Sequence, residues 1–355
     1  MRILQVITPH RLAGAERLCA HLSAALRARG HDVLICMPPR LPQFQQLCGR
    51  LGVPVELAPI AGKLNLGAPR RIAEIAKHMG ADIIHSHLSS ASVHACTAGR
   101  QARVPVVAHV HAMSSPRWYQ RADLVVACSR GVADHLRRHG LRPPVEVVYN
   151  GVSLDEFNGL PPPNHIRAAL GCSETAPLIG VVASLVPRKG HRHLLEALPR
   201  LTTRWPDLTC VVVGAGPLET SLRRLAECLG VARNVRFLGF REDRIAIMQA
   251  MDLLVLPSVA IEGFGLVLVE AAVVGVPSIA SNLPGIDEVV VDGVTGRLVP
   301  PADPLALSAA IGELLEKPAV RLRMGHAARQ RALEQFTIDQ TAAKMEDRYR
   351  RVLGL

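Results

Sequence analysis

The sequence predicts an α/β protein built from two doubly wound domains in series. Short apolar runs alternate with segments of helical period along the whole chain, and 355 residues exceed what one hydrophobic core usually serves. Asn150-Gly151 and Pro161-Pro162-Pro163 interrupt this alternation within residues 150–177, which indicates a linker. We therefore expect domains at residues 1–160 and 161–335, facing each other across a cleft. A final helix over 336–355 is expected to pack back on the first domain.

Twelve apolar runs have the continuous character of parallel strands buried on both faces. In the first half they are Ile3–Ile7, Asp32–Met37, Ile83–Ser86, Val106–Val110, Leu124–Cys128 and Val145–Tyr149. In the second half they are Leu178–Ala183, Leu208–Val213, Val235–Leu238, Leu253–Leu256, Pro277–Ala280 and Gly296–Val299. Helices are expected at Ala15–Arg29, His191–Arg200, Leu218–Leu229, Arg244–Ala250, Leu266–Val274 and Phe336–Leu353. Ligands of such sheets bind beyond the carboxyl ends of the strands, so functional residues are expected in the strand-to-helix turns.

The composition is that of an ordinary globular protein, with 49% hydrophobic and 20% charged residues. The first apolar run is too short for a signal peptide, and no segment offers about 18 uninterrupted apolar residues, so a cytoplasmic protein is predicted. The eight cysteines form no Cys-x-x-Cys pair, and we expect them to be small buried hydrophobic residues.

The positive charge is concentrated in the first domain. Residues 1–150 hold 19 Lys+Arg and 8 Asp+Glu, a difference of +11, which equals the net charge of the whole chain. Such a field suits an anionic membrane surface, a phosphorylated lipid or nucleic acid. Because only 3% of the residues are aromatic, little is available to stack bases, and nucleic acid is not expected as a partner. Solubility alone is the other explanation.

Two turns of the first domain carry candidate site residues. Gly14 lies where the Thr8–Gly14 turn meets a helix, where backbone N–H groups can approach a phosphate; a simple tight turn is the alternative. His85 and His87, and likewise His109 and His111, are spaced to share one face of a strand. Metal ligation is not predicted, because no carboxylate or cysteine stands at ligand spacing. We expect His111 to face the cleft and His85 and His109 to be satisfied, partly buried histidines.

The first strand of the second domain is followed by two adjacent cations, Arg188 and Lys189, in the turn Ser184–Gly190. They suit a diphosphate, since cations at a helix start oppose the helix dipole unless an anion is present; a solvated pair is the alternative. Gly214 closes the next strand and keeps the backbone low above the expected cleft.

The most informative segment runs from Leu253 to Ala272. A strand ends at Pro257, a loop supplies Glu262-Gly263-Phe264-Gly265, and a helix opens at Leu266 with free N–H groups. Glu270 lies inside this apolar helix and needs a partner. Vicinal sugar hydroxyls would satisfy both of its oxygens; an ion pair with an arginine is the alternative.

These residues resemble glycosyltransferase family 4, whose members have the GT-B fold of two Rossmann-like domains. The resemblance covers nearly the whole chain, and Glu-x7-Glu within Glu262–Glu270 is its most specific part. The other matching segments are Ala13–Glu16, Asp82–His87, Pro105–His111, Val148–Val152, Pro187–Gly190 and Val212–Pro217.

The resemblance implies a role for each matching residue. His111 would contact the donor sugar near the reacting centre, Gly14 would approach the donor phosphate, and Lys189 would neutralise the diphosphate leaving group. Glu262 would hold sugar hydroxyls and Glu270 the ribose. The remaining donor-binding positions implied are Ser184, Gly214, Phe240 and Arg241 near the base, and the backbone amides of Gly263, Phe264, Gly265 and Leu266.

Two positions depart from the family pattern. Ala13 replaces a glycine, which is tolerable only if this residue avoids positive φ. Ser184 replaces the arginine usually found five residues before Lys189. We hypothesise that Arg188 takes over the role of that arginine.

The resemblance implies a retaining, metal-independent transferase with no cofactor beyond its nucleotide-diphosphate sugar, a UDP-sugar being favoured. A glycan or lipid-linked acceptor in bacterial envelope, lipopolysaccharide or exopolysaccharide synthesis is expected, with possible attachment to an anionic membrane through Arg117–Arg121. A sugar-nucleotide epimerase, a phosphorylase and a non-catalytic sugar-nucleotide-binding protein are the alternatives on this fold. An NAD(P)-linked protein is disfavoured because no Gly-x-Gly-x-x-Gly is present.

Overall fold

The computed structural model describes residues 1–9, 11–260 and 262–355. Residues 10 and 261, in the predicted Thr8–Gly14 turn and Leu253–Ala272 segment, lie outside the described residues. The described chain divides into two compact units. Unit 1 comprises Met1–Ser153 and Phe336–Leu355, and unit 2 comprises Leu154–Gln335. The sequence predicted a domain boundary after residue 160, and the structure divides the chain after residue 153.

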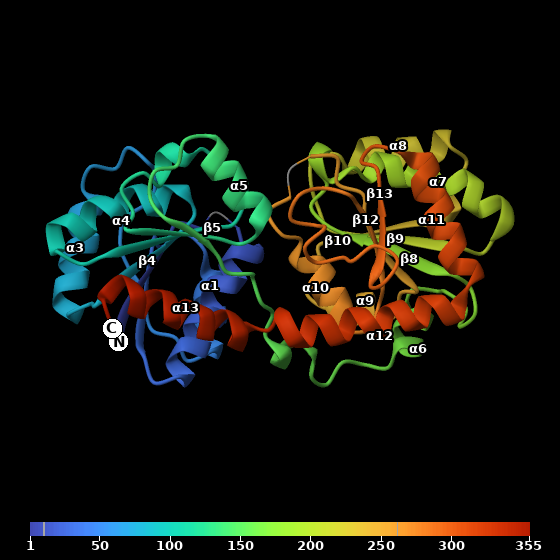
Figure 1. The fold of residues 1–355 in the computed structure, drawn as a ribbon. Coiled ribbons are helices and arrows are strands. Elements are labelled where there is room, and N and C mark those ends of the chain that lie inside the picture. Colours follow the sequence, from blue (N-terminus) through green and yellow to red (C-terminus); the bar gives the residue numbers. More distant parts are fainter. Residues whose placement is uncertain (10, 261) are drawn as a thin grey trace. The chain divides into compact units, whose positions relative to one another are not determined.

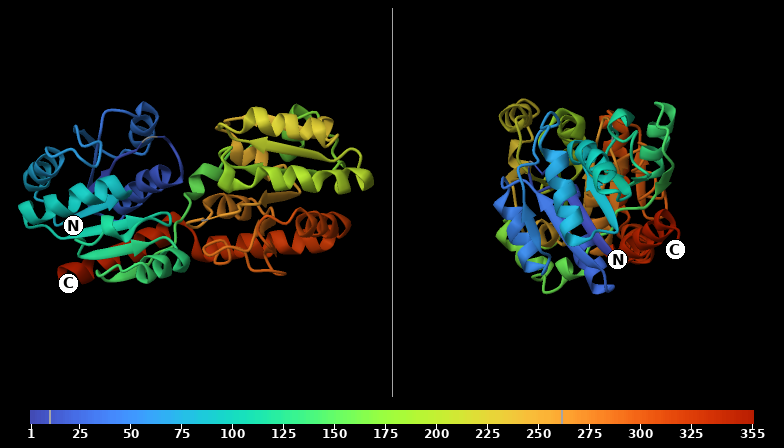
Figure 2. Two further views of the ribbon diagram at one scale, coloured as in Figure 1. Left: turned by 90° about the horizontal axis from the view of Figure 1, so that it is seen from above. Right: turned by 90° about the vertical axis from the view of Figure 1, so that its left-hand side faces the viewer.

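Unit 1 is a seven-stranded parallel sheet in the order β3-β2-β1-β4-β5-β6-β7, with helices on both faces (Figures 1 and 2). Its strands are β1 (Arg2–Ile7), β2 (Asp32–Met37), β3 (Val55–Leu57), β4 (Ile83–His87), β5 (Val106–Val110), β6 (Leu124–Ala127) and β7 (Val145–Val147). Its helices are α1 (Gly14–Ala28), α2 (Pro42–Arg50), α3 (Ala68–Met79), α4 (Ser89–Ala102), η1 (Pro116–Trp118), α5 (Arg130–Arg138) and α13 (Ile338–Leu353).

Unit 2 is a six-stranded parallel sheet in the order β10-β9-β8-β11-β12-β13, also covered on both faces. Its strands are β8 (Leu178–Val182), β9 (Thr209–Val213), β10 (Val235–Gly239), β11 (Leu253–Leu256), β12 (Ser278–Ser281) and β13 (Gly296–Val299). Its helices are η2 (Leu154–Phe157), α6 (Pro163–Ala169), η3 (Pro187–Lys189), α7 (His191–Arg204), α8 (Glu219–Cys228), η4 (Ala232–Asn234), α9 (Arg244–Gln249), α10 (Leu266–Val273), α11 (Pro304–Glu316) and α12 (Pro318–Gln335).

The predicted α/β fold with two doubly wound parallel sheets is confirmed, because every predicted strand is present to within two residues at each end. Strand β3 was not predicted, since three residues at a sheet edge carry no periodic signal. Seven cysteines are buried as expected. The expectation is wrong for Cys228, which is exposed at the end of α8 because it lies on the solvent face of that helix.

The last helix, α13, packs along α1 in unit 1 (Figure 1). Ile338, Ala342, Met345 and Tyr349 are buried on one face of α13 and join the core with Leu18, Leu22 and Leu26 of α1. This spacing of three and four residues is that of an amphipathic helix. Thr337 caps the helix, because its hydroxyl accepts a hydrogen bond from the Gln340 N–H.

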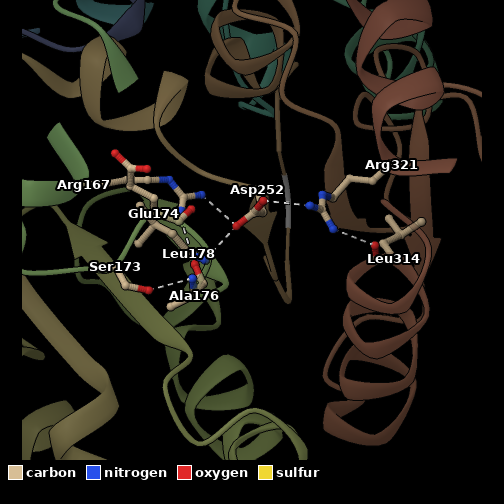
Figure 3. Close-up of polar contacts among 8 residues, drawn as sticks. All are labelled: Arg167, Ser173, Glu174, Ala176, Leu178, Asp252, Leu314 and Arg321. Atoms are coloured by element: carbon tan, nitrogen blue, oxygen red, sulfur yellow. Dashed lines mark hydrogen bonds and ion pairs between the residues drawn. The ribbon is translucent and has the colours of Figure 1, made fainter. Parts of the chain in front are cut away.

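Asp252, at the start of β11, ties together three parts of unit 2 (Figure 3). Its carboxylate accepts hydrogen bonds from Arg167 of α6 at 2.9 Å, from Arg321 of α12 at 2.9 Å and from the Leu178 N–H of β8 at 2.9 Å. The three charged side chains are between 12% and 18% exposed, so the pairs are only weakly screened by solvent. Together with the packing of α6 against α9, these bonds join the segment that contains α6 to the rest of unit 2.

Candidate functional site

The candidate residues of unit 2 follow neighbouring strands. The order β10-β9-β8-β11-β12-β13 reverses direction between β8 and β11, and a doubly wound sheet binds its ligand at such a reversal. Arg188 and Lys189 follow β8, whereas Glu262 follows β11. The sheet order therefore brings the two predicted segments to one place, although 73 residues separate Lys189 from Glu262.

Three side chains converge on one carboxylate oxygen of the buried Glu262. Lys189 Nζ bonds to Oε1, Ser258 Oγ donates to it at 2.8 Å, and Arg188 Nη1 lies 3.5 Å from it. Lys189 is 13% exposed, whereas Arg188 is 44% exposed. Two cations thus share the carboxylate of Glu262.

Two glycines make this close approach possible. At Gly190, which has φ +66°, an added Cβ would collide with the carbonyl oxygen of Pro257. At Gly214, which has φ +137°, it would collide with the carbonyl oxygen of Ala183. The turn that carries Lys189 can therefore lie directly against the end of β11. Ser184 lies in the same turn and is partly exposed.

Helix α10 opens at Gly265, which adopts φ +82°, and no side chain of the described residues caps it. The Leu268 N–H of its first turn donates to the Gly265 carbonyl oxygen at 2.8 Å, and the N–H groups of Leu266 and Val267 stand at the start of the helix, where such groups can bind an anion. The Phe264 side chain is 2% exposed, so it anchors the loop in the core, and any role in donor binding falls to its backbone. Phe240 and Arg241 directly follow β10, the edge strand of the sheet. Phe240 is 63% exposed, and Arg241 pairs with Asp243 at 2.6 Å.

Glu270 forms an ion pair with Arg244 of α9, with Nη2 to Oε1 at 2.6 Å and Nε to Oε2 at 3.3 Å. The two side chains are 11% and 13% exposed. The alternative interpretation of Glu270, a pair with an arginine, is therefore the one present here. Arg244 reaches both carboxylate oxygens, so they are satisfied here without sugar hydroxyls.

Sequence reasoning missed Arg244 and Ser258 as neighbours of the two glutamates. The sequence offers only a weak signal for Arg244, an arginine that opens an otherwise apolar helix. Ser258 directly follows the strand end at Pro257, a position from which a doubly wound sheet presents side chains.

In unit 1, Gly14 begins α1, and the candidate histidines lie on β4, on β5 and directly after β5. Ala13 has a negative φ of −122°, so alanine can replace the family's glycine at this position without strain. The N–H of Ala13 donates to Glu16 Oε2 at 3.1 Å, which helps to cap the helix.

Four histidines form a stacked cluster, which confirms that each pair shares a strand face. The ring centroids of His85 and His87 are 4.3 Å apart, and those of His109 and His111 are 4.2 Å apart. The expectation of satisfied, partly buried rings is wrong in two respects. His85 and His109 are fully buried, and neither ring nitrogen of His109 has a hydrogen-bond partner among the described residues. The cause is the hydrogen-bonded parallel pairing of β4 and β5 in the sheet interior.

Ligand atoms of His85, His87 and His109 lie within 4.8 Å of one another. Both ring nitrogens of His87 are engaged, with Gln5 and with His111, and Tyr349 bonds to His85 Nδ1 at 2.6 Å. The rings are moreover stacked or tilted rather than converging on a point. This arrangement is that of a hydrogen-bonded cluster and does not fit a metal ion.

Burial lowers the pKa of all four imidazoles, because it disfavours the charged form. The pKa of His111 falls to about 4, although the neighbouring Asn150 side chain opposes the shift. These imidazoles are therefore neutral at pH 7.

Two family models match the chain in succession. "Glycosyltransferase Family 4" matches residues 12–156, and "Glycosyl transferases group 1" matches residues 164–331. A glycogen synthase of Mycobacterium tuberculosis is 30% identical over 95% of this chain and 91% of its own length. The chain belongs to glycosyltransferase family 4.

Other members of the family are similar over shorter stretches or in fold. A GDP-mannose-dependent monoacylated alpha-(1-6)-phosphatidylinositol monomannoside mannosyltransferase of Corynebacterium glutamicum is 37% identical over 54% of this chain. The match spans 52% of that relative's length, about half. Crystal structures of Anabaena HepE with UDP and with UDP-glucose superpose with TM-scores of 0.87 and 0.85. They are 26% and 27% identical, and each alignment covers 98% of this chain and 99% of HepE.

This membership confirms the GT-B architecture. The candidate residues fall in both matched regions: Gly14 and His111 lie in the first, and Lys189, Glu262 and Glu270 lie in the second. Within the part of the chain that the structure describes, no helix is long and apolar enough to cross a membrane.

Proposed function

We propose that the protein is a retaining, metal-independent glycosyltransferase that moves a sugar from a nucleotide-diphosphate sugar to a glycan or lipid-linked acceptor. The convergence of Lys189 and Arg188 on Glu262, beside the start of α10, carries this proposal. Two cations next to the N-terminus of a helix suit a departing diphosphate.

The proposed chemistry is electrostatic. The acceptor hydroxyl attacks the anomeric carbon as the bond from that carbon to the diphosphate oxygen breaks, and its proton passes to the departing diphosphate. Attack occurs on the face that the diphosphate leaves, which retains the configuration without an enzyme-bound sugar. Lys189, Arg188 and the α10 amides stabilise the negative charge that develops on the leaving group, so no metal ion is required.

We assign each of the remaining predicted residues to one part of the donor. Glu262 holds hydroxyls of the donor sugar through its second carboxylate oxygen, Oε2. Glu270 binds the ribose while Arg244 fixes its orientation. Phe240, which is largely exposed, lies where the base is expected. His111 contacts the sugar and Gly14 the phosphate from unit 1.

A UDP-sugar remains the favoured donor, supported by the UDP and UDP-glucose complexes of HepE. Relatives named for GDP-mannose make a GDP-sugar the main competitor. We expect the purified protein to hydrolyse one class of nucleotide sugar slowly in EDTA, when UDP-, GDP- and ADP-sugars are compared by nucleotide release. Conversion of the donor to its epimer, with no net release of nucleotide, would favour an epimerase instead. No turnover of any donor, with or without Mg²⁺, would contradict the proposal.

The acceptor is proposed to be lipid-linked and presented at the inner face of the membrane. Mannosyltransferases that act on phosphatidylinositol mannosides are among the relatives. In unit 1, Leu64 and Leu66 are 92% and 94% exposed. The adjacent Lys63 lies 3.8 Å from the ring centroid of Trp118, and Arg117 lies 4.0 Å from it. Apolar side chains flanked by cations suit an anionic lipid surface.

A further inference from the structure

Ser258 is a buried serine between the end of β11 and the Glu262 carboxylate. It follows the last residue of β11 by two positions and precedes Glu262 by four. Its side chain is fully buried, and its hydroxyl donates a hydrogen bond to Oε1 of Glu262 at 2.8 Å. Glu262 is itself only 5% exposed. Because Ser258 offers no surface to solvent, it can influence a ligand only through the glutamate to which it bonds.

The backbone on either side of Ser258 is packed against the turn that carries the two cations. The carbonyl oxygen of Pro257 lies so close to Gly190 that an added Cβ there would collide with it. On the other side, the Val259 N–H donates to the Arg188 carbonyl oxygen at 2.9 Å. The Ser258 hydroxyl is joined to this backbone through a single carbon, so the end of β11 sets its position to within one side-chain torsion.

The three groups that contact Oε1 of Glu262 differ in what else attracts them. Lys189 and Arg188 are cations on long side chains, and both meet the same oxygen as Ser258. In the proposed reaction both cations are needed at the diphosphate, which competes with Glu262 for them. Ser258 is neutral and buried, so a diphosphate does not draw it away. It can therefore keep bonding to a carboxylate that would be costly to leave unpaired.

We propose that Ser258 is a positioning residue that holds Oε1 of Glu262 inward while Lys189 and Arg188 turn to the diphosphate, and so keeps Oε2 directed at the hydroxyls of the donor sugar. This inference rests on the proposed transferase function for the identity of the ligand. The bond between Ser258 and Glu262 in the ligand-free protein does not depend on that function.

The first test separates the sugar of the donor from its nucleotide. Ser258→Ala removes only the hydroxyl oxygen and leaves both cations in place. It should lower kcat/KM for the preferred nucleotide sugar about tenfold, because the carboxylate loses its fixed hydrogen bond. The inhibition constant of the corresponding nucleoside diphosphate, which carries no sugar, should stay within about twofold of wild type. Equal weakening of both ligands would mean that the variant disturbs the cations, and would overturn the inference.

Two further variants control for general damage to the fold. Ser258→Thr keeps a hydroxyl donor on the same carbon and should keep kcat/KM within about threefold of wild type. Ser308→Ala removes another buried serine hydroxyl of unit 2, which bonds to the Leu305 carbonyl oxygen at 2.9 Å within α11. This control should leave kcat/KM unchanged. A loss as large as that in Ser258→Ala would count against a specific role for Ser258.

Thermal stability supplies a readout that needs no substrate. Ser258→Ala should lower the thermal midpoint by about 3 °C in the wild-type background, because the buried carboxylate loses a donor. In a Glu262→Ala background the carboxylate is absent, so the same change should have almost no effect. Equal shifts in the two backgrounds would show that Ser258 does not hold Glu262.

The kinetic and thermal readouts fail independently. If no nucleotide sugar is turned over, the proposed function fails, and the two thermal shifts still judge whether Ser258 holds Glu262. If the donor is turned over but Ser258→Ala has the wild-type kcat/KM, the positioning role is wrong and the proposed function stands. If the extra methyl group of Ser258→Thr does not fit the buried position, the comparison of the two ligands in Ser258→Ala still decides.

Discussion

Lys189 and Arg188 are neighbours in sequence, but they meet Glu262 differently. Lys189 is mostly buried and bonded to the carboxylate, whereas Arg188 is 44% exposed and lies at the limit of contact, 3.5 Å away. Both side chains reach Glu262, which supports the hypothesis that Arg188 replaces the arginine missing at Ser184. Both cations can turn toward an anion that enters beside Glu262.

We predict that Lys189→Ala and Arg188→Ala each lower kcat on the preferred donor by about 10²- to 10³-fold, because each removes a charge that stabilises the leaving group. Steady-state kinetics with the donor identified by the screen measures this effect. Arg223→Ala, which breaks an exposed pair with Glu219 on α8, is the control and should turn over normally. An Arg188→Ala enzyme of normal rate would refute the substitution hypothesis while leaving the role of Lys189 intact.

At the scale of elements, the reversal of strand order between β8 and β11 assembles the donor half of the site. The turn after β8 brings the cations, and the loop after β11 brings the carboxylate and the start of α10. Asp252 holds the beginning of β11 in place through α6, α12 and β8 (Figure 3). It lies at the amino end of the strand, opposite the end that carries Glu262.

Asp252→Asn should therefore destabilise unit 2 without impairing donor binding. Removing the charge leaves Arg167 and Arg321 poorly paired in a largely buried setting, at a cost of about 3 kcal/mol. Thermal denaturation followed by circular dichroism should show a lower midpoint for the variant, with an unchanged KM for the donor below that midpoint. Glu219→Gln removes a surface ion pair and should change stability by less than about 0.5 kcal/mol. Equal midpoints for the two variants would contradict the structural role of Asp252.

At the scale of the whole molecule, the charge is distributed unequally between the two parts of the chain. The excess of +11 lies in residues 1–150, and the exposed Leu64 and Leu66 lie in the same part. A positive field that attracts lipid and an apolar tip that inserts between headgroups act together in interfacial binding.

We expect the protein to float with liposomes that contain anionic phosphatidylglycerol at low salt and to be released at high salt, because the attraction is screened. Replacing Leu64 and Leu66 together by serine should weaken flotation about tenfold or more, since it removes the apolar part of the contact. Leu322→Ser on α12, which is 62% exposed in unit 2, is the matched control and should not change it. Absence of wild-type flotation at low salt would contradict membrane attachment.

Much of the architecture was predictable because it depends on local patterns. Continuous apolar runs located all strands except the short edge strand β3, and the Glu262–Glu270 spacing pointed to the donor segment. The pairing of side chains was not predictable in the same way. Nothing near Glu270 in the sequence identifies Arg244 as its partner, and nothing near His111 identifies Gln5.

The sequence by itself determined the alternation of strands and helices, the membership in glycosyltransferase family 4 and the segments that carry the candidate donor residues. Only the tertiary structure decided that Glu270 is paired with Arg244, that two cations share Glu262, and that the four histidines form a cluster tied to Gln5 and Tyr349. The physical reason is that periodicity and turns are encoded over a few neighbouring residues. Hydrogen bonds and ion pairs depend instead on strand order and helix packing, which join residues from 26 to 264 positions apart.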